Sequence, residues 1–367
     1  MNLCIYNVTS TYIPGGLETY CWEMGRALAR RGHRVTLMAG NQGDAWHNEV
    51  RLLQYAFRPE KTWLNLGHRF QRLMERLSFA RHALTPLINE QFDAVVICKP
   101  YDFIPMWWAK RRGLKSKIMF HTNGTDFYFG DRWFSGVADA WAACSRYTAN
   151  QQEVHYGVST GVVHNGVDAD LFRPMERAPH RRAELGVPED ARLVLSVGRF
   201  VGWKGLRLII DALPALPDDV HYLAVGAGPE EPRMREQITA LGLTHRVHFA
   251  GRLPHDTLPE VMSLADLYVQ PSIGEESFGI GALEAMACGL PVLVSRKGGL
   301  LEVLGDEGAG AYVAAGDGAA WQFALQTALA DLTKLKQMGM RARARAEREL
   351  TWAACAARLE TYLMGMH

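Results

Sequence analysis

The sequence predicts an α/β protein with two doubly wound domains, each built on a parallel sheet that helices cover on both faces. Three observations support this prediction. The 367 residues are too many for one ordinary hydrophobic core. The content of 48% hydrophobic and 22% charged residues is typical of a folded soluble protein. Short apolar runs alternate with helical patterns along the chain, as parallel sheets require.

The apolar runs are the expected strands. In the first half they are Leu3–Asn7, Val35–Ala39, Ala94–Cys98, Lys117–His121, Ala140–Cys144 and Gly161–His164. In the second half they are Leu193–Val197, Tyr222–Val225, Val247–Ala250, Leu267–Gln270, Val292–Ser295 and Ala311–Val313. Two apolar stripes at helical spacing indicate helices that pack on these sheets. They are Leu17, Cys21, Met24 and Leu28, and Leu206, Ile209, Ile210 and Leu213.

A polar segment rich in proline and arginine, Pro174–Pro188, interrupts the alternation and marks the expected domain junction. We therefore expect one Rossmann-like domain over residues 1–172 and a second over 173–350, with a ligand cleft between them. The last segment, 351–367, reads as an amphipathic helix that packs back on the first domain.

Bulk properties exclude several classes of protein. The formal charge of +1 gives no reason to expect nucleic-acid binding. The six cysteines are scattered without a Cys-x-x-Cys pair, which favours buried free thiols in a reducing compartment over disulfides or metal ligands. The N-terminus reads as a strand and not as a signal peptide, and no run approaches the roughly 20 apolar residues of a membrane span. A cytoplasmic protein is expected.

The most informative motif is Glu275–Val292, in which Glu276 and Glu284 flank a Ser-Phe-Gly turn that opens a small-residue helix. A helix N-terminus offers unpaired N–H groups and positive dipole to a phosphate. Carboxylates on both sides suit hydroxyl groups. A sugar nucleotide fits such a site, because its phosphates lie between two groups that carry hydroxyls, the sugar and the ribose.

A basic pair, Arg199 and Lys204, follows the first strand of the second half, where ligands of open α/β sheets bind. The planar guanidinium and the compact ammonium together suit a diphosphate. A solvated basic loop is the alternative, and the glycines at 198, 202 and 205 favour close approach of a ligand. Gly226–Pro229 and Gly251–Asp256, the latter including Leu253, end the next strands and suit either a nucleobase or ordinary turns.

The first half has two comparable strand ends. Gly15-Gly16 opens a helix after the first strand and leaves room for an anion, although it is not a Gly-x-Gly-x-x-Gly fingerprint. His121 and Asp126 lie at the end of a later strand, where either a structural or a site role is reasonable. Asn165–Asp168 is a turn just before the junction.

Taken in order along nearly the whole chain, Gly15-Gly16, Asn165–Asp168, the Arg199/Lys204 pair and the Glu276/Glu284 block resemble a retaining glycosyltransferase of family 4 with the GT-B fold. The resemblance implies an acceptor-binding first domain and a donor-binding second domain. It implies that Arg199 and Lys204 hold the donor diphosphate.

The resemblance also implies roles for the other site residues. Glu276 contacts the transferred sugar and Glu284 the ribose, while N–H groups near Phe278, Gly279 and Ile280 face sugar and phosphate. Gly15-Gly16 closes over the phosphate, and His121 lies near the reacting sugar. Two departures from the family pattern stand out. Tyr20 occupies a position where the family often has histidine, and Gly202-Trp203 replaces a frequent Pro-Glu.

These features predict a hexosyltransferase that uses a nucleotide sugar and acts with retention of configuration. GDP-mannose and UDP-glucose or UDP-N-acetylglucosamine are the expected donors. Because the basic pair and the helix N-terminus stabilise the leaving diphosphate, no cofactor and no metal are expected. No confident enzymic nucleophile is found, so a same-face reaction is expected, in which the donor phosphate takes the acceptor proton.

The acceptor is expected to be a glycan or a lipid-linked glycan in polysaccharide or lipopolysaccharide synthesis. The stretch 58–82 combines six Lys or Arg with an apolar side, and Trp107-Trp108 precedes a second basic run at Lys110–Arg112. Either could rest on an anionic membrane, so a peripheral location on the cytoplasmic face is expected, with an ordinary solvated helix as the alternative.

Other classes remain as alternatives. A dinucleotide-dependent oxidoreductase would be expected to carry the fingerprint that is missing after the first strand. A sugar-nucleotide epimerase, a phosphorylase or a non-catalytic nucleotide- or glycan-binding homologue would share the architecture, and nucleotide release with and without acceptor separates them.

Overall fold

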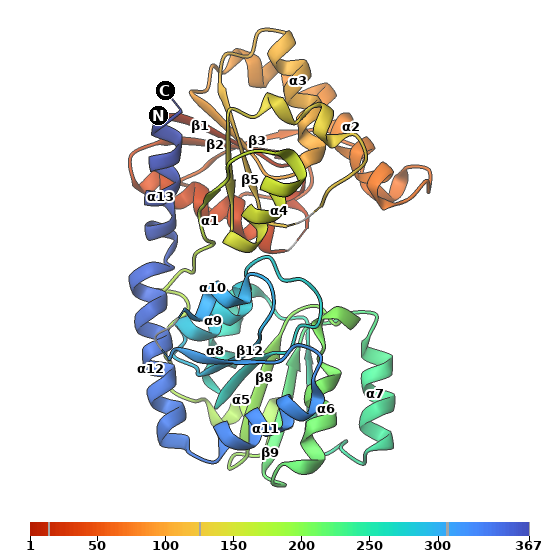
Figure 1. The fold of residues 1–367 in the computed structure, drawn as a ribbon, viewed down its shortest axis with the longest axis vertical. Helices are drawn as coiled ribbons and strands as arrows, with labels where there is room; N and C mark the ends of the chain where they lie inside the picture. The colour runs from red at the N-terminus through yellow and green to blue at the C-terminus, as the bar shows by residue number, and fades with distance from the viewer. Residues whose placement is uncertain (14, 125, 306–307, 367) are drawn as a thin grey trace. The chain divides into compact units, whose positions relative to one another are not determined.

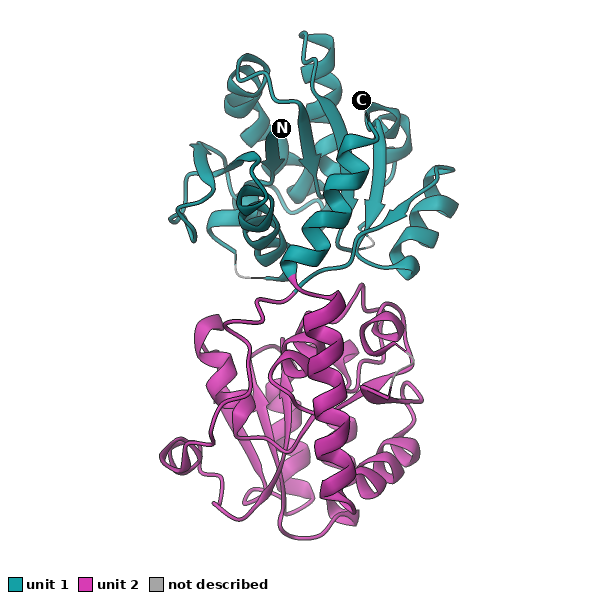
Figure 2. Cartoon of the chain, turned by 90° about the vertical axis from the view of Figure 1, so that its left-hand side faces the viewer, with its two compact units in different colours: residues 1–166, 352–367 teal, residues 167–351 magenta. Residues whose placement is uncertain are grey.

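The computed structural model describes residues 1–13, 15–124, 126–305 and 308–366. They form two compact units (Figure 2): residues 1–166 with 352–367, and residues 167–351. Each unit contains a parallel sheet with helices on both faces (Figure 1), which confirms the predicted fold class.

The sheet of the first unit has the order β3-β2-β1-β4-β5-β6-β7, and all of its pairs are parallel. Its strands are β1 (Asn2–Tyr6), β2 (Arg34–Gly40), β3 (Arg51–Tyr55), β4 (Ala94–Ile97), β5 (Lys117–Thr122), β6 (Ala140–Ala143) and β7 (Gly161–Val162). Its helices are α1 (Gly16–Arg30), α2 (His68–Asn89), α3 (Phe103–Arg111), α4 (Arg146–Tyr156) and α13 (Trp352–Met364). Strand β3 was not predicted, because its side chains are exposed or half-buried and give no apolar run.

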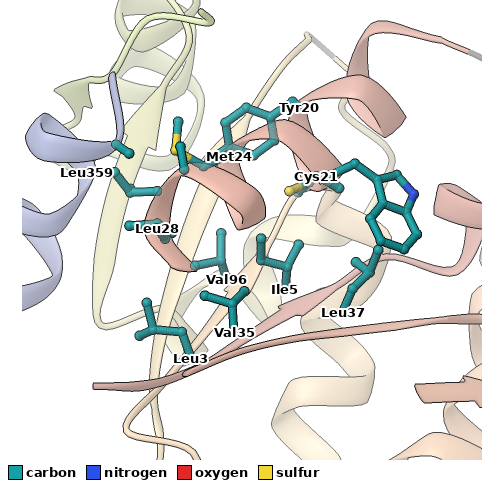
Figure 3. Packing of buried hydrophobic residues seen from close by; sticks show 14 of the residues in the cluster. Leu3, Ile5, Tyr20, Cys21, Met24, Leu28, Val35, Leu37, Val96 and Leu359 are labelled. Carbon is teal, nitrogen blue, oxygen red and sulfur yellow. The ribbon is translucent and has the colours of Figure 1, made fainter. Parts of the chain in front are cut away.

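Alternation along β1 divides the core of this unit into two layers. Leu3 and Ile5 face α1 and α13, where they pack with Met24, Leu28 and Leu359 (Figure 3). Cys4 and Tyr6 face the opposite layer, under α2 and α3. A strand that is apolar on both faces is what a sheet covered twice requires.

The sheet of the second unit has the order β10-β9-β8-β11-β12-β13, again parallel throughout. Its strands are β8 (Arg192–Val197), β9 (Val220–Val225), β10 (Val247–Gly251), β11 (Leu267–Gln270), β12 (Val292–Ser295) and β13 (Gly310–Val313), each near its predicted position. Its helices are α5 (Pro179–Glu184), α6 (Arg207–Ala212), α7 (Glu231–Ala240), α8 (Leu258–Ser263), α9 (Ile280–Ala287), α10 (Leu300–Leu304), α11 (Gly318–Leu329) and α12 (Leu332–Glu349).

The boundary between the units follows Gly166 and not residue 172 as expected from the sequence. Arg343 of α12 donates hydrogen bonds to the carbonyls of Ala169 (3.0 Å) and Phe172 (2.6 Å), and these bonds hold 167–172 in the second unit. The Pro174–Pro188 segment is also part of that unit. Its buried Arg182 donates to the carbonyls of Glu189 (2.7 Å) and Leu264 (2.7 Å).

All six cysteines are buried and none is in a disulfide, as the spacing indicated. Among the described helices, none combines the length and the apolar composition that crossing a membrane would need.

Candidate functional site

Glu276 lies in the loop between β11 and α9, and a network of donors fixes its carboxylate. Its Oε1 accepts from Lys204 Nζ (2.5 Å), Ser272 Oγ (2.6 Å) and Gln270 Nε2 (2.9 Å). The side chain is buried, and the ion pair with Lys204 is largely shielded from solvent. A buried carboxylate with three donors is held in one orientation, which is a property of a positioned functional group.

Lys204 reaches Glu276 because the loop after β8 is hydrogen-bonded to the loop after β11. The N–H groups of Ile273 (2.8 Å) and Gly274 (3.0 Å) donate to the carbonyl of Trp203. Gly205, which ends the turn at Lys204, has φ +66°, and a Cβ there would lie 2.1 Å from the carbonyl oxygen of Pro271. Only glycine permits this close approach of the two backbones.

Gly279 begins α9 next to Glu276. Its φ of +109° lies in the left-handed region, and a Cβ would lie 2.5 Å from Leu300. Gly279 supplies no side-chain cap, so first-turn N–H groups of α9 are available to an external acceptor. The N–H of Gly299 donates to the Glu276 carbonyl (2.8 Å), which clamps the loop from the other side.

Glu284 lies on α9 and is also buried. Its Oε1 accepts from His255 Nε2 at 2.6 Å, a contact that was not predicted. Burial raises the pKa of Tyr268 above its usual range, and the negative charges of Glu284 and Glu276 raise it further. Both carboxylates are therefore close enough to influence this one buried phenol. The structure therefore gathers Lys204, Glu276 and Glu284 around the carboxyl ends of β8 and β11.

The remaining predicted residues of this unit are less constrained. Arg199 is exposed in the loop after β8, and Leu253 is half-buried in the loop after β10. Phe278 is buried and Ile280 is half-buried, both beside the start of α9. Among the described residues, the structure shows no hydrogen bond or ion pair between Arg199 and Glu276.

In the first unit, Gly15 and Gly16 begin α1; the preceding Pro14 lies outside the described residues. A Cβ on Gly15 would lie 2.7 Å from Glu18 Oε2. Glu18, to which no role was assigned from the sequence, is buried and accepts from Thr9 Oγ1 at 2.5 Å. Burial raises the pKa of this carboxyl, so the helix start carries a constrained acid next to its glycines.

His121 is completely buried on β5 and stacks on Tyr20 with ring centroids 4.4 Å apart. Its Nε2 donates to the carbonyl of Val163 (3.1 Å), which assigns Nδ1 as the acceptor from Asn123 (3.2 Å). Burial lowers the pKa of His121 to about 4, so the imidazole is neutral near pH 7. The Tyr20 that departs from the family pattern thus packs against this histidine.

Asp126, which was expected beside His121 at the end of β5, is instead engaged by cations. Its carboxylate accepts hydrogen bonds from Lys99 Nζ (2.6 Å) and Arg72 (3.3 Å). Burial by itself would raise the pKa of Asp126, but the neighbouring cations lower it.

An Asp-x-Asp sequence is present at Asp168–Asp170. Asp168 Oδ1 accepts from the backbone N–H groups of Asp170 (3.1 Å) and Leu171 (3.2 Å), so this carboxylate stabilises a turn. Within the described part of the chain, no group of three or more His, Cys, Asp or Glu residues is arranged to hold a metal ion.

Among the six cations of 58–82, Arg76 does not face solvent. This side chain is buried and donates to Asp102 (2.6 Å) and Asn7 (2.9 Å). Leu64 and Leu66, by contrast, are 77% and 69% exposed in the loop before α2. The exposed large apolar side chains of this stretch are therefore those of the loop before α2.

Two family models match the chain. "Glycosyltransferase Family 4" matches residues 14–171, and "Glycosyl transferases group 1" matches residues 178–345. Among curated proteins, the chain is 30% identical over 363 residues to phosphatidyl-myo-inositol mannosyltransferase of Mycobacterium leprae, covering 95% of this chain and 92% of that one. It is 33% identical over 394 residues to D-inositol 3-phosphate glycosyltransferase of Xylanimonas cellulosilytica, covering 95% and 91%.

Solved structures share the fold at lower identity. Sucrose-phosphate synthase of Thermosynechococcus elongatus superposes with a TM-score of 0.85 and 23% identity, covering 100% of this chain and 98% of that one. Anabaena HepE in complex with UDP and glucose gives a TM-score of 0.82 and 21% identity, with both chains fully covered.

Proposed function

This chain belongs to glycosyltransferase family 4 and has the GT-B fold, and from that premise we propose that it transfers a hexosyl residue from a nucleoside diphosphate sugar with retention of configuration. The observation that carries the proposal is the Lys204–Glu276 pair beside the start of α9. A cation, a carboxylate and helix N–H groups in one place match a sugar joined to a diphosphate.

In this proposal Lys204 and Arg199 bind the diphosphate. Glu276 accepts hydrogen bonds from hydroxyls of the transferred sugar, and Glu284 accepts from the ribose. Leu253 lies against the base, and N–H groups near Phe278, Gly279 and Ile280 complete the donor site. The charge that develops on the leaving diphosphate is stabilised by donors already fixed in place, which supports catalysis without a metal.

The first unit contributes Gly15, Gly16 and His121 in this proposal. Because burial lowers the pKa of His121 to about 4, its imidazole is neutral near pH 7 and does not act as a cation beside the reacting sugar. The acceptor proton passes to the departing phosphate oxygen, on the same face of the sugar as the attacking hydroxyl.

The donor is proposed to be GDP-mannose or a UDP-hexose, and the acceptor a glycan or lipid-linked glycan. The names of two relatives support a second acceptor candidate, because both mention an inositol that carries a phosphate group. Within 58–82, peripheral attachment to an anionic membrane would use the exposed side chains of Lys61, Leu64, Leu66 and Arg69.

Thermal denaturation with UDP, GDP, ADP and their sugars tests the donor, because a nucleotide that binds the folded state raises Tm by mass action. Nucleotide release is then measured with glycan and inositol phosphate acceptors. We expect release to depend on an acceptor and to fall by about two to three orders of magnitude in Lys204→Ala and Glu276→Ala. Acceptor-independent epimerisation of the donor, or normal transfer by both variants, would refute the assignment.

A further inference from the structure

A second surface of the first unit carries exposed aromatic rings next to cations. Phe129 and Trp133 are 89% and 75% exposed, and their ring centroids are 5.6 Å apart. Trp107, on α3, packs edge-on against Phe134 at 5.5 Å, and the guanidinium of Arg111 lies 4.2 Å from its ring. These side chains, from α3 and the turns at 127–137, are called the aromatic surface below.

An open groove of about 560 Å³ runs through part of the aromatic surface, and Phe129 lies outside its lining. Its lining includes Trp107, Lys110, Arg111, Trp133 and Phe134. Large side chains as exposed as Phe129 and Trp133 are unusual on a soluble protein when they gather in one place, and such patches mark interaction sites. The composition of the groove suits a partner that contacts aromatic rings and cations together.

The charge around the groove identifies that partner. Arg111, Arg112, Lys115 and Arg132 are exposed in the surrounding sequence. The groove-lining acid Asp139 accepts from Lys110 Nζ (3.4 Å) and the Ile118 N–H (2.8 Å), while Asp131 is buried against Tyr156 (2.8 Å). Since the whole chain has a formal charge of only +1, this excess of positive charge is local.

We propose that the aromatic surface docks on an anionic lipid bilayer, with Phe129 and Trp133 entering the headgroup boundary and the cations meeting lipid phosphates. Aromatic rings favour this boundary, and Lys and Arg side chains near an anionic leaflet add electrostatic attraction. A glycan would need acceptors as well as donors for its hydroxyls, whereas two of the three charged side chains that line this groove are cations and the third, Asp139, already accepts from Lys110 and the Ile118 N–H.

The experiment is sedimentation of the full chain with vesicles of phosphatidylcholine, with and without phosphatidylglycerol. We expect binding only with the anionic lipid, and weakening as salt rises. Phe129→Ala/Trp133→Ala should lower the affinity on the order of tenfold because interfacial apolar area is lost. Arg111→Glu/Arg132→Glu should lower it by more than roughly thirtyfold, because the attraction of two cations to the leaflet is lost and the two glutamates are repelled by it.

Matched controls come from the second unit, where Phe323 is 70% exposed and Arg233 and Lys336 are exposed cations. Phe323→Ala and Arg233→Glu/Lys336→Glu should bind like wild type. Thermal melts check that every variant folds. Trp133→Phe should still bind vesicles. Brominated lipid should quench the tryptophan fluorescence of this variant less than that of wild type, a result that would place the Trp133 ring at the acyl boundary.

Three outcomes would overturn the proposal. The first is equal binding to neutral and anionic vesicles. The second is wild-type binding by both aromatic-surface variants. The third is loss of all binding in Leu64→Ala/Leu66→Ala alone, which would assign docking to the 58–82 loop. Because vesicle binding is measured without donor or acceptor, it is independent of the proposed transferase reaction.

Discussion

Removing the Glu276 carboxylate should cost both stability and activity. In Glu276→Ala, three donors lose their acceptor: the ammonium of Lys204, the hydroxyl of Ser272 and the amide of Gln270. Lys204 keeps some access to water, whereas Gln270 and Ser272 are buried. An unsatisfied buried donor costs about 1–3 kcal/mol, so the two buried donors together cost about 2–6 kcal/mol.

The isosteric Glu276→Gln separates shape from charge. It keeps an oxygen acceptor for Ser272 and Gln270 but loses the ion pair with Lys204, so we expect a smaller cost of about 1–2 kcal/mol. Both variants should transfer sugar about two to three orders of magnitude more slowly, because the charge-assisted contact with the donor is lost in both.

Thermal denaturation gives the stability change, and the double variant Lys204→Ala/Glu276→Ala completes a cycle that isolates the pair. A loss of about 2–6 kcal/mol lowers Tm by on the order of 10 °C in a unit of this size. Glu236→Ala, an exposed acid on α7, is the control and should stay within about 0.5 kcal/mol. If the single effects are additive, or if Glu276→Gln transfers sugar normally, the geometric argument fails.

Three further changes test other parts of the structure. Gly205→Ala should lower Tm and weaken donor binding, because its Cβ meets Pro271 at φ +66°; unchanged melting and nucleotide affinity would contradict this. Since the fold lowers the pKa of His121 from 6.5 to about 4, that residue contributes stability above pH 6.5 that is lost as the pH falls toward 4. The contribution is about 3 kcal/mol, and His121→Phe should flatten the stability–pH curve over that window. Leu359→Ala, buried under α1, should cost about 2–5 kcal/mol, whereas Glu360→Ala, in a partly exposed ion pair, should cost less than about 1 kcal/mol in the same denaturation assay.

Elements with a strong local signal could be predicted from the sequence, and contacts between distant segments could not. Every strand of the second unit is a short apolar run, whereas β3, with an exposed Arg51 and half-buried Leu52, does not stand out. Glu276 and Glu284 were recognisable as a motif. The ion pair of Glu276 with Lys204, 72 residues away, depends on how two loops bond to each other.

The same limit explains the errors. Arg76 reads as one more cation on an amphipathic helix until Asp102, 26 residues later, is seen beside it. His255 is exposed and its loop is ordinary, so nothing local indicates that it donates to Glu284.

The route of the chain through the two units has a consequence for synthesis on the ribosome. The core of the first unit includes Cys355, Leu359 and Leu363 from α13, which pack on α1. Because translation delivers these residues after residue 351, the second unit has its full set of strands before the first can close its core. Until α13 has been synthesised, the apolar face of α1 in the nascent first unit stays uncovered. A fragment that stops at Gly166 should therefore require chaperones or aggregate, whereas 167–351 should be the better candidate for separate expression.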